Sequence, residues 1–162
     1  MAITKDKKKE ILSNLKDIFE KSKSVVFLNF HGLGVEDTTT MRRQLKADGV
    51  GYYVAKKSLA KKALSETPFE GEMPELVGEV AFAYSGDETG SARGVYEFQK
   101  KFKDGVRIVG GIFENKYMDE MKMTEIAQIP SLYVLRGQFV NIINSPIQQF
   151  VVSLSEIAKS RE

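Results

Sequence analysis

The stretch SVVFLNF, residues 24–30, decides how the chain around it is interpreted. Most of its residues are β-branched or aromatic, and it stops at His31-Gly32, which predicts a buried β-strand. Before it, apolar residues recur at helical spacing and predict an amphipathic helix over residues 4–22. After it, residues 35–48 repeat that spacing, and Gly49 is typical of the position just past a helix end.

The same reasoning extends over the first 128 residues. A double glycine inside VRIVGGIF predicts a β-bulge or a close approach of two backbones. When the first helix and a short basic helix are set aside, the order is β-α-β followed by β-α-β. This order predicts an α+β, ferredoxin-like split β-α-β sandwich over residues 1–128, with two helices on one face of an antiparallel sheet. The remaining predicted elements are strands over 50–55, 80–85 and 106–113, helices over 58–66, 87–102 and 119–128, and a loop over 68–79.

Residues 129–162 form a second predicted part, a long C-terminal amphipathic α-helix. Within it QFVNIINSPIQQFV, residues 138–151, contains the triplet Gln-Phe-Val twice, eleven residues apart. Eleven residues make about three helical turns, so the two triplets lie on nearly the same face. Ser145-Pro146 predicts either the start of a second helical segment or a kink in a single helix.

The apolar stripe of this helix has to be covered. Leaving about eight large apolar side chains in water would forgo roughly 12–24 kcal/mol, more than the ~5–15 kcal/mol stability of a typical protein. Two ways of burying the stripe are possible: it packs on the first domain, or it binds a partner. The repeated triplet favours a partner, because a single core contact does not need two copies. The candidate partner-binding residues are Leu135, Phe139, Val140, Ile143, Ile147, Phe150, Val151, Leu154 and Ile157.

The composition disfavours an enzyme. The 162 residues include no cysteine and a single histidine, His31, so cysteine nucleophiles, disulfides and histidine-based metal clusters are excluded. HGLG (31–34) is similar to the glycine-rich oxyanion loop of esterases, but no G-x-S-x-G segment supplies a nucleophile. A phosphate-cradling G-x-x-x-x-G-K is absent as well. The sequence therefore predicts no catalytic residue, metal site, cofactor or small-molecule substrate.

The composition and the absence of long apolar runs indicate where in the cell the protein is located. The absence of cysteine fits a cytosolic protein. The sequence contains no run of 18 or more apolar residues, and its opening, MAITKDKKKE, has no apolar signal core. We expect a cytoplasmic protein that is not inserted in a membrane.

Positive charge is concentrated in the first half. Residues 1–70 carry 14 lysines and arginines against nine acidic residues, whereas residues 71–130 carry seven against eleven. Two stretches, MRRQLK (41–46) and VAKKSLAKKAL (54–64), hold seven basic residues and no acid. Such clusters bind phosphate backbones by releasing counterions, which predicts RNA binding, although a solubilising lysine surface is the alternative. The predicted contacts are Arg42, Arg43, Lys46, Lys56, Lys57, Lys61 and Lys62.

Several segments together resemble the bacterial large-subunit ribosomal protein L-ten family, whose members stand at the base of the ribosomal stalk. In chain order they are FHGLGV (30–35) with Met41-Arg42, Gly49-Val50, VAKKSLAKKA (54–63), LVGEVAFAYS (76–85), VGGIFEN (109–115) and IPS (129–131). The resemblance covers almost the whole chain. Two positions depart from the family pattern, because Lys57 stands where Asn is usual and Glu79 stands where Pro often follows the glycine.

The resemblance implies a structural protein of the large ribosomal subunit, located in the ribosome. The N-terminal domain would bind large-subunit rRNA beside ribosomal protein L-eleven. The C-terminal helix would hold dimers of the acidic stalk protein L-seven/L-twelve, which recruit GTP-bound translation factors. Carried over by position, the resemblance adds His31, Gly32 and Ser58 to the RNA contacts. From the two Gln-Phe-Val triplets we expect two dimers per chain.

A function of a different class remains as the alternative. The chain would then be a free RNA-binding adaptor or regulator whose C-terminal helix self-associates. Self-association of the isolated chain would favour this alternative, and monomers that take up a small acidic protein would disfavour it.

Overall fold

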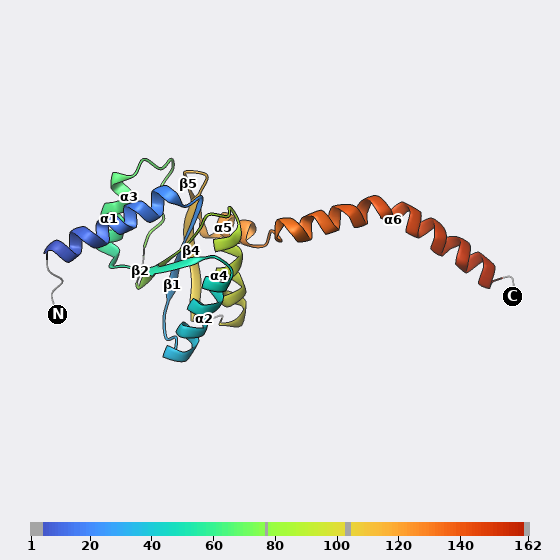
Figure 1. Ribbon diagram of the computed structural model, residues 1–162, viewed down its shortest axis with the longest axis horizontal. Helices are drawn as coiled ribbons and strands as arrows, with labels where there is room; N and C mark the ends of the chain where they lie inside the picture. Colours follow the sequence, from blue (N-terminus) through green and yellow to red (C-terminus); the bar gives the residue numbers. More distant parts are fainter. Residues whose placement is uncertain (1–4, 77, 103–104, 161–162) are drawn as a thin grey trace. The chain divides into compact units, whose positions relative to one another are not determined.

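The computed structural model describes residues 5–76, 78–102 and 105–160 (Figure 1). It divides into two compact units, Met1–Ile129 and Pro130–Glu162, which we consider separately. In the described residues the first unit contains the β-sheet with its helices, and the second contains one helix. The roles predicted for these two parts of the chain stay predictions.

A five-stranded antiparallel sheet organises the first unit. In the described residues its strand order is β2-β3-β1-β4-β5. β1 and β2 run in the same direction with β3 between them, and β3 and β4 run in the same direction with β1 between them. Two β-α-β units therefore interleave, which confirms the predicted α+β, ferredoxin-like split arrangement. The strands are β1 (Ser24–Phe30), β2 (Gly51–Val54), β3 (Val80–Ser85), β4 (Val106–Phe113) and β5 (Lys116–Asp119).

Helices cover both faces of this sheet. Figure 1 shows α1 and α3 on the opposite side of the sheet from α4 and α5. The two helices predicted for one face are α2 and α4, which share a core with α5, and the additional α1 and α3 close the other face. The bounds are α1 (Lys5–Lys21), α2 (Val35–Ala47), α3 (Lys57–Glu66), α4 (Gly90–Lys101) and α5 (Glu120–Ala127).

The central strand β1 is buried on both sides. Val26 and Leu28 belong to the core under α2 and α4, whereas Val25 and Phe27 belong to the core under α1 and α3. Phe27 meets the ring of Phe82 edge-on, with centroids 5.4 Å apart. Burial on two faces explains why residues 25–28 are all apolar, whereas a strand with one face in water would alternate apolar and polar residues.

Gly49 ends α2 as predicted. It has a φ of +74°, and its N–H donates to the carbonyl of Lys46 at 3.2 Å. The N–H of Val50 donates to the carbonyl of Leu45 at 2.8 Å. These two hydrogen bonds form a Schellman motif, which leads the chain directly from α2 toward β2.

The double glycine produces both features that its presence predicts. Phe27 pairs with Gly110 while Leu28 pairs with Ile108, so β4 contains one extra residue, a β-bulge. Gly110 has a φ of +154°, and a Cβ there would lie 2.7 Å from the carbonyl oxygen of Met118. Both the conformation and the close approach of β5 therefore require glycine at position 110.

Some predicted boundaries were wrong. The helix expected from Asp87 begins at Gly90, because the N–H of Asp87 donates to the Ser85 hydroxyl at 3.0 Å and the chain turns there first. The helix expected from Ser58 begins one residue earlier, and Thr4, the expected start of the first helix, lies outside the described residues. Residues 116–118, for which no element was predicted, form β5 together with Asp119, which was expected to begin the last helix of the domain.

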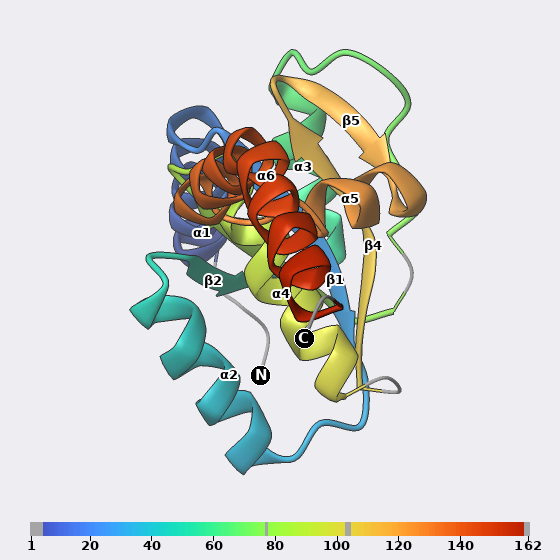
Figure 2. The same ribbon diagram turned by 90° about the vertical axis from the view of Figure 1, so that its right-hand side faces the viewer.

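β4 and β5 form a hairpin (Figure 2). Its two turn residues are Glu114 and Asn115. Both residues have positive φ, 49° and 63°, as in a two-residue type I′ turn. The usual Asn-Gly or Asp-Gly signal of such a turn is absent, so the sequence does not predict the hairpin.

Replacing Glu114 with Asn should raise the free energy of unfolding by about 0.5–1 kcal/mol, because Asn tolerates left-handed backbone better than Glu. Urea denaturation would show the gain as a higher midpoint with an unchanged slope. Glu114→Ala removes the same charge without the backbone advantage and should give no gain. Equal stabilisation by the two variants would contradict this explanation.

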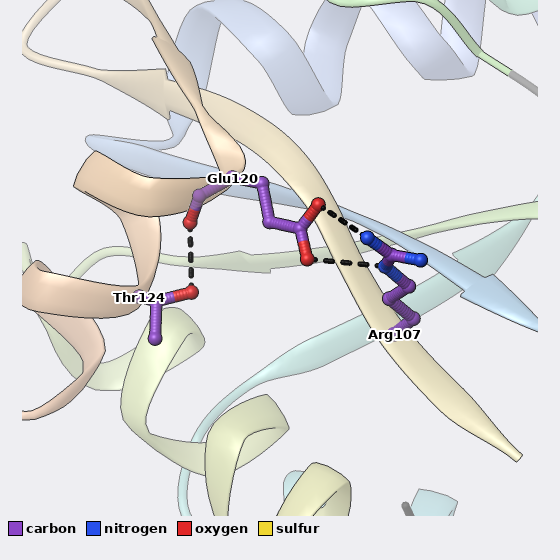
Figure 3. A network of polar contacts seen from close by, with 3 residues as sticks. All are labelled: Arg107, Glu120 and Thr124. Carbon is purple, nitrogen blue, oxygen red and sulfur yellow. Dashed lines mark hydrogen bonds and ion pairs between the residues drawn. The ribbon is translucent and has the colours of Figure 1, made fainter. Parts of the chain in front are cut away.

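An ion pair joins α5 to the sheet (Figure 3). Arg107 of β4 donates from Nε and Nη2 to the two carboxylate oxygens of Glu120, each at 3.0 Å. The carbonyl of Glu120, the first residue of α5, accepts a hydrogen bond from Thr124 at 2.7 Å. The hydrogen bond to Glu120 raises the pKa of Arg107 above its usual value. Because the pair is exposed, it orients α5 more than it stabilises the fold.

The second unit is the helix α6 (Leu132–Lys159), which confirms the predicted long C-terminal helix. The Ser131 hydroxyl caps it by accepting a hydrogen bond from the N–H of Val134 at 3.5 Å. Pro146 lies inside the helix, so a separate second segment is wrong. Figure 1 shows one helix that bends part-way along, as expected when a proline removes a backbone donor. None of the described helices, α6 included, is long and apolar enough to cross a membrane.

Candidate nucleic-acid and partner interfaces

One end of the sheet gathers the predicted RNA contacts that follow strands. Because β1 and β2 run in the same direction, residues 31–32 and 56–58 lie at the same end. We call His31, Gly32, Lys56, Lys57 and Ser58 the sheet-end surface, and all five are exposed. A hollow of about 490 Å³ opens beside it, lined by Phe30, Val54, Ala55, Lys56, Lys57, Gly78, Glu79 and Val80.

Part of the sheet-end surface is the N-terminus of α3. Lys56 is the N-cap residue, and its carbonyl accepts hydrogen bonds from the N–H groups of Leu59 and Ala60 at 2.9 and 3.1 Å. No side chain caps this end. The unpaired N–H groups and the dipole of a helix attract anions at its start, and Lys56 and Lys57 add two full charges there. This arrangement suits a phosphate group.

Two lysines that were not predicted as RNA contacts, Lys100 and Lys101, lie beside His31. The N–H of His31 donates to the carbonyl of Gly105 at 3.0 Å. A hollow of about 610 Å³ is lined by His31 and Gly32 together with Lys100 and Lys101 from the end of α4. The sequence does not show that these residues are neighbours. Their proximity follows from the pairing of Phe30 with Val106, which places the residues before β4 next to those after β1.

Two further lysines that were not predicted as RNA contacts, Lys8 and Lys9, lie near the predicted contact Lys62 between α1 and α3. A hollow of about 450 Å³ there is lined by Lys8 and Lys9 of α1 and by Lys62 of α3, with Leu12 and Leu59 as its apolar part. Lys16 also lines it but forms an ion pair with Glu66. In the sequence, the acidic residues of KDKKKE make these lysines look like an ordinary exposed helix turn. Only the packing of α1 against α3 shows which of them face Lys62.

The basic residues of α2 are set apart from those of α3. α2 and α3 cover opposite faces of the sheet, so Arg42, Arg43 and Lys46 do not join Lys61 and Lys62 in one cluster. All five are exposed. The guanidinium carbon of Arg42 lies 5.2 Å from the ring centroid of Tyr52, a cation–π contact that holds this side chain over β2. Burial raises the pKa of Tyr52, against the opposing effect of Arg42.

The Lys16–Glu66 pair leads to a pH prediction. The hydrogen bond with Lys16 lowers the pKa of Glu66 from its ordinary value of 4.5. The pair's contribution is therefore complete above the unfolded pKa and is lost as the pH falls through the lower folded pKa. We expect Glu66→Gln to lower the Tm at pH 7 and the difference from the unmodified chain to disappear toward pH 3, as followed by circular dichroism.

Glu97→Gln is the matched control, because Glu97 is exposed and lies outside the described ion pairs. It should leave the Tm unchanged across this range. A Tm difference for Glu66→Gln that persists at pH 3 would show that the carboxylate charge is not its cause.

The predicted partner-binding side chains all lie on α6 and are exposed. Considered by itself, the second unit is one helix, and it buries none of its residues. The nine predicted residues are between 38% and 65% exposed. Five further large apolar side chains on α6 are exposed, which gives an apolar surface of the kind that marks interaction sites. They are Leu132, Tyr133, Val134, Ile142 and Val152.

In the part of the chain that the structure describes, no group of three or more acidic or histidine side chains is arranged to hold a metal ion. The surfaces instead combine exposed lysines on a folded domain with an exposed apolar helix.

Comparison with known proteins decides the family. The model of the family described as Ribosomal protein L10 matches residues 3–101, which reach from the start of α1 to the end of α4. The chain belongs to the ribosomal protein L10 family.

Relatives extend the match into α6. The large ribosomal subunit protein uL10 of Erythrobacter litoralis is 35% identical over 142 residues, 88% of this chain and 82% of the relative. The uL10 protein of Clostridium acetobutylicum is 31% identical over 96% of this chain and 92% of the relative. The uL10 protein of Nitrosospira multiformis is 28% identical over 97% and 90%.

Membership of the L10 family confirms several predictions from the sequence. The resemblance to the L-ten family was correct, and the chain is a ribosomal protein of the large subunit and not an enzyme. The expected ribosomal location agrees with the family. The individual RNA-contacting and partner-binding residues stay predictions.

Proposed function

We propose that this L10-family chain binds large-subunit rRNA through its first unit and anchors dimers of the acidic stalk protein L-seven/L-twelve through α6, beside ribosomal protein L-eleven. The dimers would recruit GTP-bound translation factors, so the chain acts as a scaffold. The observation that carries the proposal is the presence of two unlike exposed surfaces in one chain: lysines around the start of α3, and an apolar stripe on α6.

The RNA-binding half rests on charge and backbone geometry. The sheet-end surface combines an uncapped helix start with Lys56 and Lys57, and exposed lysines continue along α3 at Lys61 and Lys62. Lys8 and Lys9 across the hollow, and Lys100 and Lys101 beside His31, extend the positive surface. Such contacts position a protein on phosphates and do not by themselves read the base sequence.

Replacing Lys56, Lys61 and Lys62 together with Ala should weaken binding to purified large-subunit rRNA. The slope of log K against log salt should become shallower by about 2–3, because each lost phosphate contact removes close to one released counterion. Filter-binding titrations over a salt series would measure it.

The matched control places Arg at the same three positions. It keeps the charges and should keep the slope. Far-ultraviolet circular dichroism would verify that both variants are folded. A slope unchanged by the Ala replacements would show that these lysines only solubilise the surface.

The partner-binding half rests on a repeated unit in α6. We define module one as Phe139, Val140 and Ile143, and module two as Phe150, Val151 and Leu154. Each residue of module two follows its counterpart by eleven residues, so the modules face nearly the same way. All six side chains are exposed, and an apolar helix face of this kind suits packing with the helices of a partner.

Native mass spectrometry of the reconstituted complex should show two acidic dimers per chain. Replacing Phe139 and Val140 with Ala should remove one dimer, and the matching change at Phe150 and Val151 should remove the other. Alanine preserves helix propensity, so each loss reports on contacts and not on helix formation.

Tyr133→Ala is the control, because Tyr133 is 87% exposed on the same helix but belongs to neither module. It should leave two dimers bound. Three dimers on the unmodified chain would refute the pairing of one module with one dimer. Sedimentation of the chain alone tests the adaptor alternative, since a self-associating α6 would give concentration-dependent oligomers.

A further inference from the structure

The segment of α6 that holds the two modules lacks charge on every side. Between Arg136 and Glu156 lie 19 residues without a charged side chain, in a protein whose residues are 28% charged. This charge-free band begins at Gly137, next to the first Gln-Phe-Val triplet, and ends at Ser155, next to Leu154. It is therefore coextensive with the two modules. The exposed sides of α1 to α5 all carry charged residues, whereas this band carries none on any side, which indicates cover on more than the apolar stripe.

A shallow hollow of about 470 Å³ lies on the polar side of this band. Its lining residues are Ser145, Gln148, Gln149, Val152 and Ser153. The first four are spaced i, i+3, i+4 and i+7, the four positions that surround a hole in knobs-into-holes packing of helices. At about 100° per residue, the centre of these four is roughly opposite Leu154, on the far side from the modules.

We propose that these four residues, the Val152 hole, receive an apolar side chain from a helix of the acidic partner, so that partner helices pack on both sides of α6. The inference rests on the proposed function and adds a second contact surface to it. Val152, which is 55% exposed, supplies an apolar contact in the hole. Gln149 donates from Nε2 to the Ser145 hydroxyl at 3.4 Å, which orders one side of its rim.

The chemistry of the rim favours an enclosed surface. Covering a charged side chain costs several kcal/mol unless it finds an ionic partner, whereas amides and hydroxyls need only hydrogen bonds. The Val152 hole has no charge to desolvate, and its glutamines and serine can exchange hydrogen bonds with polar groups of a neighbouring helix.

The acidic partner is favoured over a second copy of this chain. The Val152 hole shares Gln149 with the second Gln-Phe-Val triplet, so it continues the surface proposed for that partner. Self-paired helices usually fix their register with charged residues beside the apolar seam. The charge-free band offers none.

Single cysteines test the proposal, because the natural chain contains no cysteine. Gln148→Cys places a thiol on the rim of the Val152 hole. Lys159→Cys is the matched control, since it lies eleven residues later at nearly the same angle but outside the charge-free band. Each full chain is labelled with a water-soluble maleimide, first alone and then saturated with purified acidic stalk protein.

We expect labelling at position 148 to slow by about ten-fold or more in the complex, and labelling at position 159 to stay unchanged, because thiol reactivity follows exposure. Loss of partner binding by Gln148→Cys, with binding by Lys159→Cys retained, would also support the proposal.

Equal labelling at position 148 with and without bound partner would overturn the inference while leaving the two modules standing. Failure of the unmodified chain to bind the acidic protein would overturn the proposed function and this inference together. Protection of position 148 that rises with the concentration of the chain alone would assign the Val152 hole to a second copy and overturn the choice of occupant.

Discussion

The pairing of β1 with both β3 and β4 is the constraint on which the rest of the first unit depends. It places β1 in the middle of the sheet, where helices bury it on both faces. A buried contact between the hydroxyls of Ser24 and Ser91, 2.8 Å apart, joins the start of β1 to α4. The same antiparallel order makes β1 and β2 parallel, and this alone brings residues 31–32 to the end of the sheet where residues 56–58 begin α3.

The parts of the fold that the sequence predicts are those controlled by local chemistry. Residues 24–30 and 80–85 are predicted as strands because most of their side chains are apolar. Gly49 is predicted as a helix end because a left-handed residue is needed there. β5 is different. Its turn holds Glu114 and Asn115 in a left-handed conformation, which the pairing of β4 with β5 imposes. No local sequence pattern predicts this turn. The first turn of α4 is likewise displaced by a hydroxyl of the preceding strand.

The candidate site shows the same division. Sequence pattern predicts which lysines are exposed, because each sits on the polar side of a periodic segment. It does not predict which of them are neighbours, since that depends on register and on the face each helix covers. Lys62 of α3 lines one hollow with Lys8 and Lys9 of α1, and His31 lines another with Lys100 and Lys101 from the end of α4. Arg42 and Lys61, close in the sequence, are separated by the sheet.

The repeat in α6 has a consequence for how such a helix changes length. Eleven residues turn a helix by three full turns plus about 20°. Duplicating or deleting one eleven-residue unit therefore leaves all the remaining units facing almost as before. In the proposed function, where each unit holds one dimer, the number of bound partners would therefore change by whole steps without any interface being rebuilt. Each added unit would also rotate the next docking face slightly in the same direction, so that a longer helix would present its partners along a slow spiral and relieve crowding between them.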